Sequence, residues 1–590
     1  MGTQKSVKDS IHGYIEFTEA YRKIIDTPEF QRLKWIEQTS YRVLYPSARH
    51  DRFIHSLGVF HLGGIAFDAL MNEDHGVVHD ALVETEIAGN RLKELKDAFL
   101  AACLLHDIGH APMSHTLEDL YYQGNPSKLL GGPLHQRLFN ALDKRQCPGE
   151  MTEDTIKAFK QHYEIMYNNT EYTQPKAHEI VSSIVILERA HELNLTEAML
   201  KNLDLIIRAI LGCTYVVTGE GKYKKEMSIK NCLIRLLNGH SVDVDKLDYI
   251  TRDSAMSGHK NASIDDMRLL KAMTAIEDAD KILRPAFRKS ALSVIKNVMY
   301  AKNAQSRWII NHPAVVYESY LVNKSIEDTM RLFIDKYCRN NDSQPICEEK
   351  TCNNLKACKN NKCVIQEPQH LMDRLFSVDA LSVDGISIQG RVFRLLCDSD
   401  IVSLMKEFMC KSLYIRQLFN RNLRHKPLWK SSEEYVHLFK KNKVDKRITV
   451  SDFFRPIFLH AYESEINRDK GILVDDELYQ LAQNKDKKDM RNAIEFLRQF
   501  KKYGDFVLLP ISGGFFSDID YDRTFFVFGD DKDGYKSYRD LESELIKITD
   551  SNVNVEDEYK PFYIHAPCQA DIKEILNQLI IKIGGLYPPA

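Results

Sequence analysis

Apolar residues recur at helical spacing along much of this chain. Stripes with the period of an α-helix run through residues 180–190, 203–211 and 231–237. The stripes indicate helices with one face turned toward a core. We therefore expect residues 180–300 to be helical, with a short break from Thr218 to Lys224.

The pattern changes to apolar–polar alternation near the C-terminus. Residues 506–513, 524–531 and 559–567 read as strands. An amphipathic helix from Gln569 to Gly584 is expected to pack on them. The fold class is therefore predicted to be mainly α, with a helical core and a smaller C-terminal α+β lobe.

Shifts in pattern and composition suggest where the parts of the chain begin and end. The first 60 residues look irregular, with a helix after Thr27 and Pro28, because threonine caps helices and proline fits the first turn. The chain has room for two to four domains of usual size. The expected parts are a helical core (1–330), a Cys-rich segment (331–366), a helical extension (367–500) and the α+β lobe (501–590).

Composition limits the classes of partner. The chain has 590 residues, of which 44% are hydrophobic and 28% charged, with a net charge of −3. A chain near neutrality offers no general case for binding nucleic acid, so an anionic nucleotide would need a local basic pocket. No run of eighteen apolar residues is present, and no membrane span is expected. The N-terminus is polar, and we expect a cytoplasmic protein.

Five of the twelve cysteines cluster in a polar segment. The overall density is too low for a disulfide scaffold, and the scattered cysteines read as small buried apolar residues. The spacing of the cluster, C-x8-C-x4-C-x5-C-x4-C, suggests a small zinc-stabilised knuckle. Free surface thiols are the alternative, and an iron–sulfur cluster is less favoured. The candidate zinc ligands are Cys338, Cys347, Cys352, Cys358 and Cys363.

The stretch from Phe99 to Glu118 has the strongest chemical signal. An apolar helix leads directly into adjacent His106 and Asp107, and His110 follows one turn later. The nearby residues Gly109 and Pro112 terminate helices, so the polar cluster should lie at or just past a helix end. Imidazole and carboxylate side chains are suitable ligands for a divalent metal.

Further ligands would have to come from other parts of the chain. His55 follows Arg52 near the start of an apolar helix, although a hydrogen-bonded interior histidine would look the same. The segment from Ser241 to Asp253 reads as a helix with several polar residues on one side. A solvated face is the alternative interpretation of this side. Its residues are Asp245, Asp248, Tyr249 and Arg252.

Three motifs occur in a fixed order: RFxHSLG at 52–58, HDxGHxPxSH at 106–115 and DVDKxDYxxRD at 243–253. Together they resemble the HD-domain deoxynucleoside triphosphate triphosphohydrolase family, in the branch that includes the human sterile-alpha-motif and HD-domain dNTPase. The likeness starts near Lys8 and runs to about His312. It implies an HD-domain helical core, in which residues 119–177 are an insertion that gates the pocket.

The resemblance implies one divalent metal at the HD motif. Its ligands would be His55, His106, Asp107 and Asp245. Ligand type alone does not choose between Fe, Mn, Mg, Co and Zn. A metal of this kind polarises a phosphoryl oxygen and lowers the pKa of a bound water.

The resemblance also implies catalytic and phosphate-binding residues. His178 is the candidate general acid or base, with His135 as a rival, and Glu118 would orient His178. The cationic groups placed around the phosphates would be Arg52, Lys246, His110 and His115.

The sugar would be held by Gln38, Tyr249 and Asp253, with Asp253 accepting a hydrogen bond from its 3′-hydroxyl. A helix from about Val294 to His312 matches a family helix that faces the nucleotide. This chain has Lys302 there, where the family tends to place arginine, histidine or tyrosine.

The implied reaction is hydrolysis of dNTPs to deoxynucleoside and triphosphate, which would control the dNTP pool, including in antiviral defence. Two alternatives stay open: an HD-type phosphodiesterase or nuclease acting on single-stranded nucleic acid, and a nucleotide-sensing regulator without turnover. The implied partners are a dNTP substrate, a nucleotide activator and further copies of the chain, as a dimer, tetramer or hexamer.

Overall fold

The computed structural model describes residues 5–72, 76–122, 132–144, 151–169, 174–217, 221–258, 264–278, 281–337, 368–440, 450–463, 471–483, 487–510, 522–527, 535–541 and 562–585. The chain forms two compact units, each discontinuous in sequence. Unit 1 consists of Met1–Asn303, Met330–Ser403 and Ser517–Ile546. Unit 2 consists of Ala304–Thr329, Leu404–Phe516 and Lys547–Ala590.

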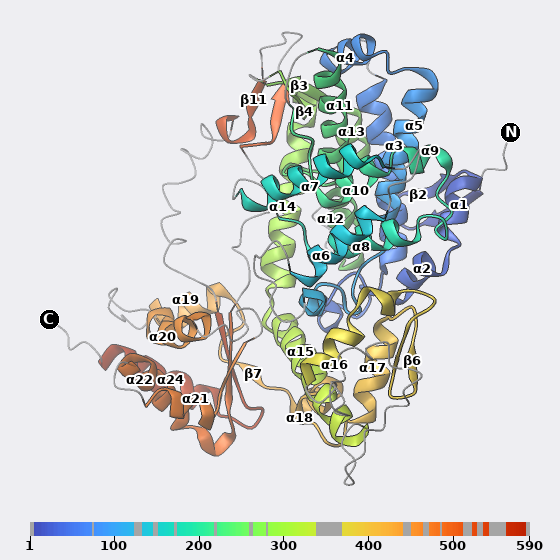
Figure 1. The fold of residues 1–590 in the computed structure, drawn as a ribbon. Coiled ribbons are helices and arrows are strands. Elements are labelled where there is room, and N and C mark those ends of the chain that lie inside the picture. Colours follow the sequence, from blue (N-terminus) through green and yellow to red (C-terminus); the bar gives the residue numbers. More distant parts are fainter. Residues whose placement is uncertain are drawn as a thin grey trace. The chain divides into compact units, whose positions relative to one another are not determined.

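Unit 1 is a helical assembly built around α3 (Arg52–Met71), and the expected mainly-α fold is confirmed (Figure 1). Helix α3 packs against α5 (Gly89–Leu105), α12 (Val244–Met256) and α13 (Asp266–Lys271). The other α-helices of this unit are α1 (Glu19–Ile25), α2 (Pro28–Gln31), α4 (Val77–Thr85), α6 (Pro133–Asp143), α7 (Glu153–Asn168), α8 (Ala177–Arg189), α9 (Glu197–Lys201), α10 (Leu203–Leu211), α11 (Lys222–Leu237) and α16 (Pro368–Leu375).

Helix α3 forms because an apolar run follows a good cap. The side chain of Asp51 accepts a hydrogen bond from the backbone N–H of Ile54, which satisfies one free donor of the first turn. The helix is long and apolar enough to cross a membrane, with a mean hydropathy of 1.4. However, 61% of that stretch is buried inside the protein, as in the core helix of a soluble domain.

The expectation of an irregular N-terminus was wrong for residues 5–17, which form an antiparallel hairpin. Strands β1 (Lys5–Asp9) and β2 (Gly13–Phe17) pair along their length. The side chain of Asp9 accepts hydrogen bonds from the backbone N–H groups of Ile11 and His12, which shapes the turn. The expected helix after Thr27 is the short helix α2.

The expectation of helix throughout 180–300 was also wrong at one place. Strands β3 (Met273–Glu277) and β4 (Leu283–Arg288) form an antiparallel hairpin. It belongs to a sheet of order β11-β10-β4-β3, in which β10 (Phe525–Val527) runs parallel to β4 and antiparallel to β11 (Tyr535–Ser537). The predicted C-terminal strands are therefore divided between two sheets, because β10 pairs with a strand far away in sequence.

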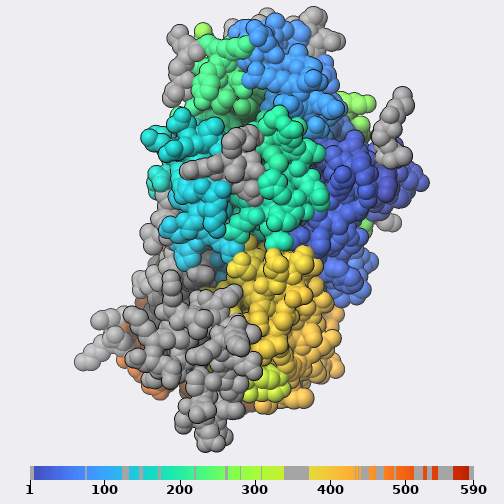
Figure 2. Space-filling view, turned by 45° about the vertical axis from the view of Figure 1, so that its right-hand side comes forward, coloured from blue at the N-terminus to red at the C-terminus, as the bar shows by residue number. Residues whose placement is uncertain are grey.

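The expected insertion at 119–177 contains two amphipathic helices, α6 and α7. Figure 2 shows the cyan surface of this part of the chain beside the green surface of the residues that follow, and α6 packs against α8. A further hairpin of unit 1 is formed by β5 (Ile386–Ile388) and β6 (Arg391–Phe393). The chain passes from one unit to the other within α14 (Leu292–Gln305), α15 (Pro313–Tyr337) and α17 (Asp398–Glu407).

Unit 2 has its own sheet, of order β7-β12-β9-β8, and its own apolar core. Trp429, Phe454 and Leu579 are buried in this core. The strands are β7 (Lys426–Pro427), β8 (Ile472–Val474), β9 (Phe506–Pro510) and β12 (Phe562–Ala566). The helices are α18 (Leu413–Phe419), α19 (Ser432–Lys440), α20 (Val450–Glu463), α21 (Asp476–Leu481), α22 (Lys488–Arg498) and α24 (Ile572–Gly585).

Candidate active site in unit 1

The HD motif follows directly on the end of α5, as the sequence predicted. The turn after Asp107 packs closely against α8, where the hydroxyl of Ser182 donates to the carbonyl of His106 at 2.6 Å. The same hydroxyl accepts from the N–H of Gly109 at 2.9 Å. A β-carbon at position 109 would lie 2.2 Å from the backbone nitrogen of Ser182, so only glycine fits.

We predict that Gly109→Ala lowers the free energy of unfolding by about 1–3 kcal/mol, because backbone atoms must move to admit the methyl group. Denaturant unfolding of the purified variant measures this loss. The matched control is Gly64→Ala in α3, where the nearest atom would lie 3.8 Å away on Leu100. The control should unfold like the wild type or gain up to about 1 kcal/mol from helix propensity. Equal stability of both variants would argue against the close packing.

Two residues from other segments, the buried Arg32 and the half-buried Asp398, hold the HD turn in shape. Arg32 donates to the carbonyls of Ile108 and His110 at 2.8 and 2.9 Å. The carboxylate of Asp398 accepts from the backbone N–H groups of Met113 and Glu37 at 2.6 and 2.9 Å, and burial raises its pKa to about 6. Neither residue carried a signal in the sequence, because each acts only through distant partners.

The proposed metal ligands meet in one place. The Nε2 atoms of His55 and His106 are 3.3 Å apart. Nε2 of His55 is 3.0 Å from Oδ1 of Asp245 and 3.7 Å from Oδ2 of Asp107. Nε2 of His106 lies 3.5 Å from Oδ1 of Asp107. These nitrogen and oxygen donors therefore face one another from α3, the end of α5 and α12.

Both imidazoles are oriented for this role by their second nitrogen. Nδ1 of His106 donates to the carbonyl of Cys103 at 2.9 Å, and Nδ1 of His55 donates to Oδ2 of Asp248 at 2.7 Å. Each bond places the proton on Nδ1 and leaves the lone pair of Nε2 facing the cluster. Two imidazole and two carboxylate donors at these separations fit one divalent cation.

The charges of the cluster favour a cation between these side chains. Burial lowers the pKa of His55, but hydrogen bonds to Asp245 and Asp248 outweigh this and raise the pKa to about 10. Burial also opposes the ionised form of Asp107, yet Arg52 and the surrounding histidines hold its pKa far below the usual range. The carboxylates thus stay ionised and require positive charge beside them. Without a metal a proton on Nε2 of His55 supplies that charge, and a bound cation would displace this proton and take up the Nε2 lone pair.

Asp248 lies beside this cluster, and the sequence had not assigned it a role in the site. It is fully buried and accepts hydrogen bonds from His55, from His12 at 2.6 Å and from Arg252 twice at 2.9 Å. Arg252 in turn donates to Asp9 at 2.8 Å. The hairpin β1–β2 is thereby joined to a proposed metal ligand.

We predict that Asp248→Asn weakens binding of a divalent cation by about 10- to 100-fold, because the negative charge and one of the two oxygens that accept from His55, His12 and Arg252 are lost. Calorimetric titration of the metal-free protein with Mn²⁺ measures the affinity. The control Asp266→Asn alters a carboxylate 3.5 Å from His12 that has no contact with His55, and it should bind as the wild type does. Unchanged affinity in Asp248→Asn, with the fold intact by circular dichroism, would contradict the orienting role.

Beside this cluster lies a second group of histidines around Glu118. Oε1 of Glu118 accepts from Nδ1 of His178 at 2.7 Å, and Oε2 accepts from Nδ1 of His115 at 2.6 Å. Burial lowers the pKa of His178, but the Glu118 carboxylate outweighs this and raises it. Nε2 of His178 lies 4.0 Å from Oδ1 of Asp107, so a protonatable nitrogen stands next to the proposed metal site.

His110 stacks on His178, with ring centres 4.2 Å apart. It is completely buried, and neither of its ring nitrogens has a hydrogen-bond partner among the described residues. Burial holds its pKa well below the ordinary value, so the ring is neutral. The three rings of His110, His115 and His178 are close enough to act on one group.

Two of the proposed phosphate-binding cations, Arg52 and Lys246, differ in their position relative to the histidine groups. Arg52 is buried and donates to Oδ2 of Asp107 at 2.8 Å, with its other end 3.4 Å from Nε2 of His115. Lys246 instead points back to its own helix start and bonds to Asp243 at 2.5 Å and to the carbonyl of Gly239 at 2.7 Å. Arg52 thus joins both histidine groups, whereas Lys246 is held by other residues.

The proposed sugar-binding residues are also partly engaged. Lys302 donates to the hydroxyl of Tyr249 at 2.8 Å. Asp253 bonds through Oδ1 to Nε2 of His50 at 2.6 Å, and Gln38 is buried. His50 was not selected from the sequence, although it lies two positions before Arg52.

The remaining candidates lie elsewhere. His135, the rival of His178, bonds to the hydroxyl of Tyr163 at 3.0 Å. Geometry therefore favours His178 as the histidine beside the HD motif. The cysteines of the candidate zinc knuckle, from Cys338 to Cys363, lie outside the described residues.

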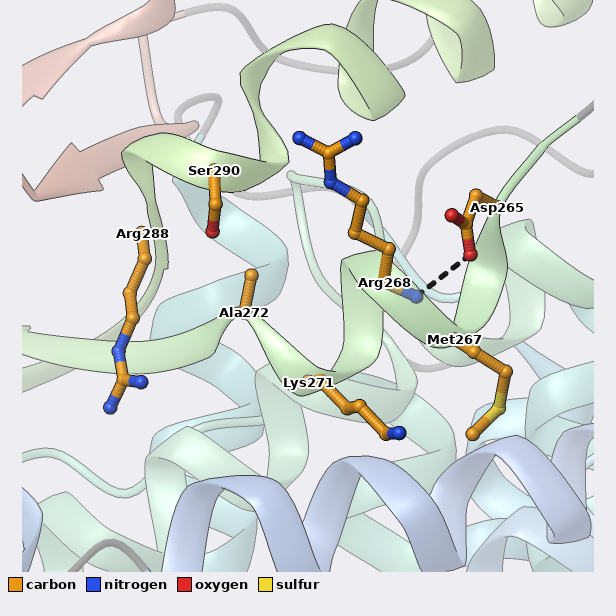
Figure 3. Close-up of a pocket in the computed structure, with 7 residues that line it drawn as sticks. All are labelled: Asp265, Met267, Arg268, Lys271, Ala272, Arg288 and Ser290. Atoms are coloured by element: carbon orange, nitrogen blue, oxygen red, sulfur yellow. Dashed lines mark hydrogen bonds between the residues drawn. The ribbon is translucent and has the colours of Figure 1, made fainter.

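A separate pocket of about 420 Å³ is lined by basic residues (Figure 3). Arg268 and Lys271 come from α13, and Arg288 from the end of β4. In Figure 3, the Arg268 and Lys271 side chains extend in opposite directions. The cationic groups of this pocket therefore do not converge on a single point in this view.

Comparisons with known proteins agree with the motifs. No family model matches the chain. An uncharacterized protein of Methanocaldococcus jannaschii is 24% identical over 323 residues, which cover 55% of this chain and 49% of that protein. Deoxynucleoside triphosphate triphosphohydrolase SAMHD1 of Bos taurus is 26% identical over 314 residues, 52% of this chain and 45% of that protein.

Other similarities are shorter or weaker. The human protein of the same name is 38% identical over 120 residues, 20% of this chain and 17% of that protein. A hypothetical protein of Aquifex aeolicus with a solved structure aligns over 98% of this chain and 100% of that one, with 17% identity and a TM-score of 0.48. The matched part of this chain spans about half the length of its relatives: 49% of the Methanocaldococcus jannaschii protein and 45% of the Bos taurus protein.

Proposed function

Since the chain belongs to an HD-domain family similar to the deoxynucleoside triphosphate triphosphohydrolases, we propose that it hydrolyses dNTPs to deoxynucleoside and triphosphate. The observation that carries this proposal is the meeting of His55, His106, Asp107 and Asp245 beside the Glu118–His178 pair. Phosphoester hydrolysis needs Lewis-acid activation of the phosphorus and a proton for the leaving oxygen. The four ligands would hold the cation that supplies the first, and His178 beside them would supply the second.

The ligand set would hold one divalent cation, which supplies Lewis-acid polarisation of a phosphoryl oxygen and lowers the pKa of a water. The donor types suit Fe, Mn, Mg, Co or Zn. Arg52 keeps Asp107 ionised and correctly turned through a bond of 2.8 Å. This pairing lets Asp107 present its other oxygen, Oδ1, to His106 at 3.5 Å.

The phosphates would lie against the histidine group. Arg52 and His115 are 3.4 Å apart, and His110 offers ring nitrogens that lack a partner among the described residues. Phosphate oxygens are strong acceptors and would satisfy these donors. Lys246 and Lys302 would reach the substrate only after releasing Asp243 and Tyr249.

His178 would act as the general acid that protonates the leaving 5′-oxygen of the deoxynucleoside. Glu118 fixes the tautomer by accepting from Nδ1, so Nε2 is the atom that gives up the proton. The raised pKa of His178 keeps a proton available near neutral pH. Tyr249 would pack against the sugar and leave little space for a 2′-hydroxyl.

The direct test is product analysis with each of the four dNTPs and each of the four NTPs in the presence of Mn²⁺. Ion-exchange chromatography should show deoxynucleoside and intact triphosphate from dNTPs. Product from dNTP mixtures only would support a nucleotide activator. No product from any mixture would refute the proposal and favour a nuclease, tested with a labelled oligonucleotide, or a sensor without turnover.

Three further properties belong to the proposal. We place the protein in the cytoplasm, as a homo-oligomer of the dimer, tetramer or hexamer type, with a role in dNTP balance. Structural zinc at the cysteine cluster is proposed from spacing alone. Size-exclusion chromatography with light scattering and elemental analysis of the purified protein test the assembly and the zinc.

A further inference from the structure

His50 and Gln38 form a pair of buried polar residues that lies beside the proposed active site. The backbone N–H of Gln38 donates to the carbonyl of His50 at 2.9 Å, so the two residues are neighbours across adjacent chain segments. Gln38 is 8% exposed and His50 is 5% exposed. Polar side chains this deeply buried normally have hydrogen-bond partners.

Each of the two side chains has an atom that lacks such a partner among the described residues. These atoms are Nδ1 of His50 and Oε1 of Gln38. Leaving a buried acceptor unsatisfied costs free energy, and in native structures such atoms commonly mark a place for a ligand or an ordered water.

The protonation of His50 follows from its other nitrogen. Nε2 lies 2.6 Å from Oδ1 of Asp253. An ionised carboxylate only accepts hydrogen bonds, so Nε2 carries the proton. In the neutral imidazole Nδ1 is then an acceptor, and its missing partner must be a donor such as a hydroxyl group.

The position of this acceptor relative to the metal ligands follows from the bonds of Arg52. Arg52 lies two residues after His50 and contacts the carbonyl of Gln38 at 3.5 Å with one nitrogen. With another it donates to Asp107 at 2.8 Å. Asp253 is on α12, the helix that also carries Asp245. Two contacts therefore place His50 near the proposed metal ligands. Its chain neighbour Arg52 bonds to Asp107, and its partner Asp253 lies on the helix that carries Asp245.

We infer that His50 is a specificity-determining residue, whose Nδ1 accepts a hydrogen bond from the 3′-hydroxyl of the substrate sugar. Asp253 holds the imidazole in the required tautomer and orientation. The side-chain amide of Gln38, turned so that its NH2 group takes the position of the unpartnered oxygen, donates to the oxygen of the same hydroxyl. This inference rests on the proposed function, because it assigns a sugar-recognising residue to that same reaction. A site built to bond a hydroxyl discriminates strongly against analogues that lack it.

The test compares kcat/KM for a dNTP and for the matching 2′,3′-dideoxynucleoside triphosphate. His50→Gln keeps an amide that can donate to Asp253 but removes the acceptor at the Nδ1 position. We expect kcat/KM for the dNTP to fall about 10- to 100-fold and kcat/KM for the dideoxy analogue to stay within about twofold. His50→Asn, which returns an amide oxygen near the Nδ1 position, should recover part of the loss.

The control His162→Gln changes a histidine of α7 that bonds to the backbone of Val216, and both substrates should react as with the wild type. An equal loss on both substrates in His50→Gln would overturn the inference but leave the proposed function standing. No product from the wild-type protein with any dNTP would overturn the proposed function, and the inference with it. If His50→Gln does not fold, the same comparison is made with His50→Asn, which should then lose less than tenfold and only on the dNTP.

Discussion

Asp107→Asn should abolish both metal binding and turnover. The substitution removes one negative charge from a cluster in which Asp107 faces His55, His106 and Arg52. A catalytic cation contributes several kcal/mol to transition-state stabilisation, and about 4 kcal/mol corresponds to roughly a 1,000-fold loss of kcat. Elemental analysis of the purified variant should find no stoichiometric metal at this site.

A control substitution away from the site distinguishes the loss of one negative charge from the loss of a proposed metal ligand. Asp68→Asn neutralises an exposed carboxylate that pairs with Lys96, and an exposed pair of this kind contributes little. This control should keep wild-type metal content and activity. If Asp107→Asn retained the metal and more than a tenth of the activity, the assignment of the metal site would be wrong.

His178→Ala should lower kcat by about 100- to 10,000-fold while the metal content stays that of the wild type, because general acid catalysis contributes a factor of that size. His178 bonds to Glu118 and not to the proposed metal ligands, so its loss should leave the metal ligands in place. Steady-state kinetics together with elemental analysis separate this result from that of Asp107→Asn.

The leaving group provides a further check on the role of His178. An aryl analogue with a nitrophenolate leaving group needs no proton at departure. His178→Ala should therefore hydrolyse this analogue at a rate close to that of the wild type. An equal loss on the dNTP and on the aryl analogue would indicate that His178 positions the substrate and does not donate the proton.

The sequence located the centre of the site because its chemistry is carried by short contiguous motifs. His106 and Asp107 follow the end of an apolar helix, and Asp245 begins another helix with polar residues on one side. The spacing of apolar residues was sufficient to predict that these residues lie at the ends or on one face of helices. The structure places Nε2 of His55 3.3 Å from His106, 3.0 Å from Asp245 and 3.7 Å from Asp107, as the order of the motifs had suggested.

The surrounding residues were not predictable, because their partners are distant in sequence. Asp248 was seen only as one member of a polar helix face, yet it bonds to His12 and His55. Arg32 and Asp398 hold the HD turn from other segments. Lys246 looked like a free cation, but a nearby carboxylate at the helix start, Asp243, already binds it.

The missed β3–β4 hairpin has a similar cause. Strands β3 and β4 lie within a stretch of strong helical periodicity, and their alternation covers only a few residues each. Pairing with β10, from a segment more than 200 positions later, stabilises them. Short strands of this kind depend on tertiary partners more than on local propensity.

The proposed reaction is attack of water at the α-phosphorus with departure of the intact deoxynucleoside. Hydrolysis of a dNTP in water enriched in oxygen-18, followed by mass spectrometry of both products, tests it most directly. Attack at phosphorus should leave one heavy oxygen in the triphosphate and none in the deoxynucleoside. Label in the deoxynucleoside, or release of a nucleoside mono- or diphosphate in place of triphosphate, would contradict it.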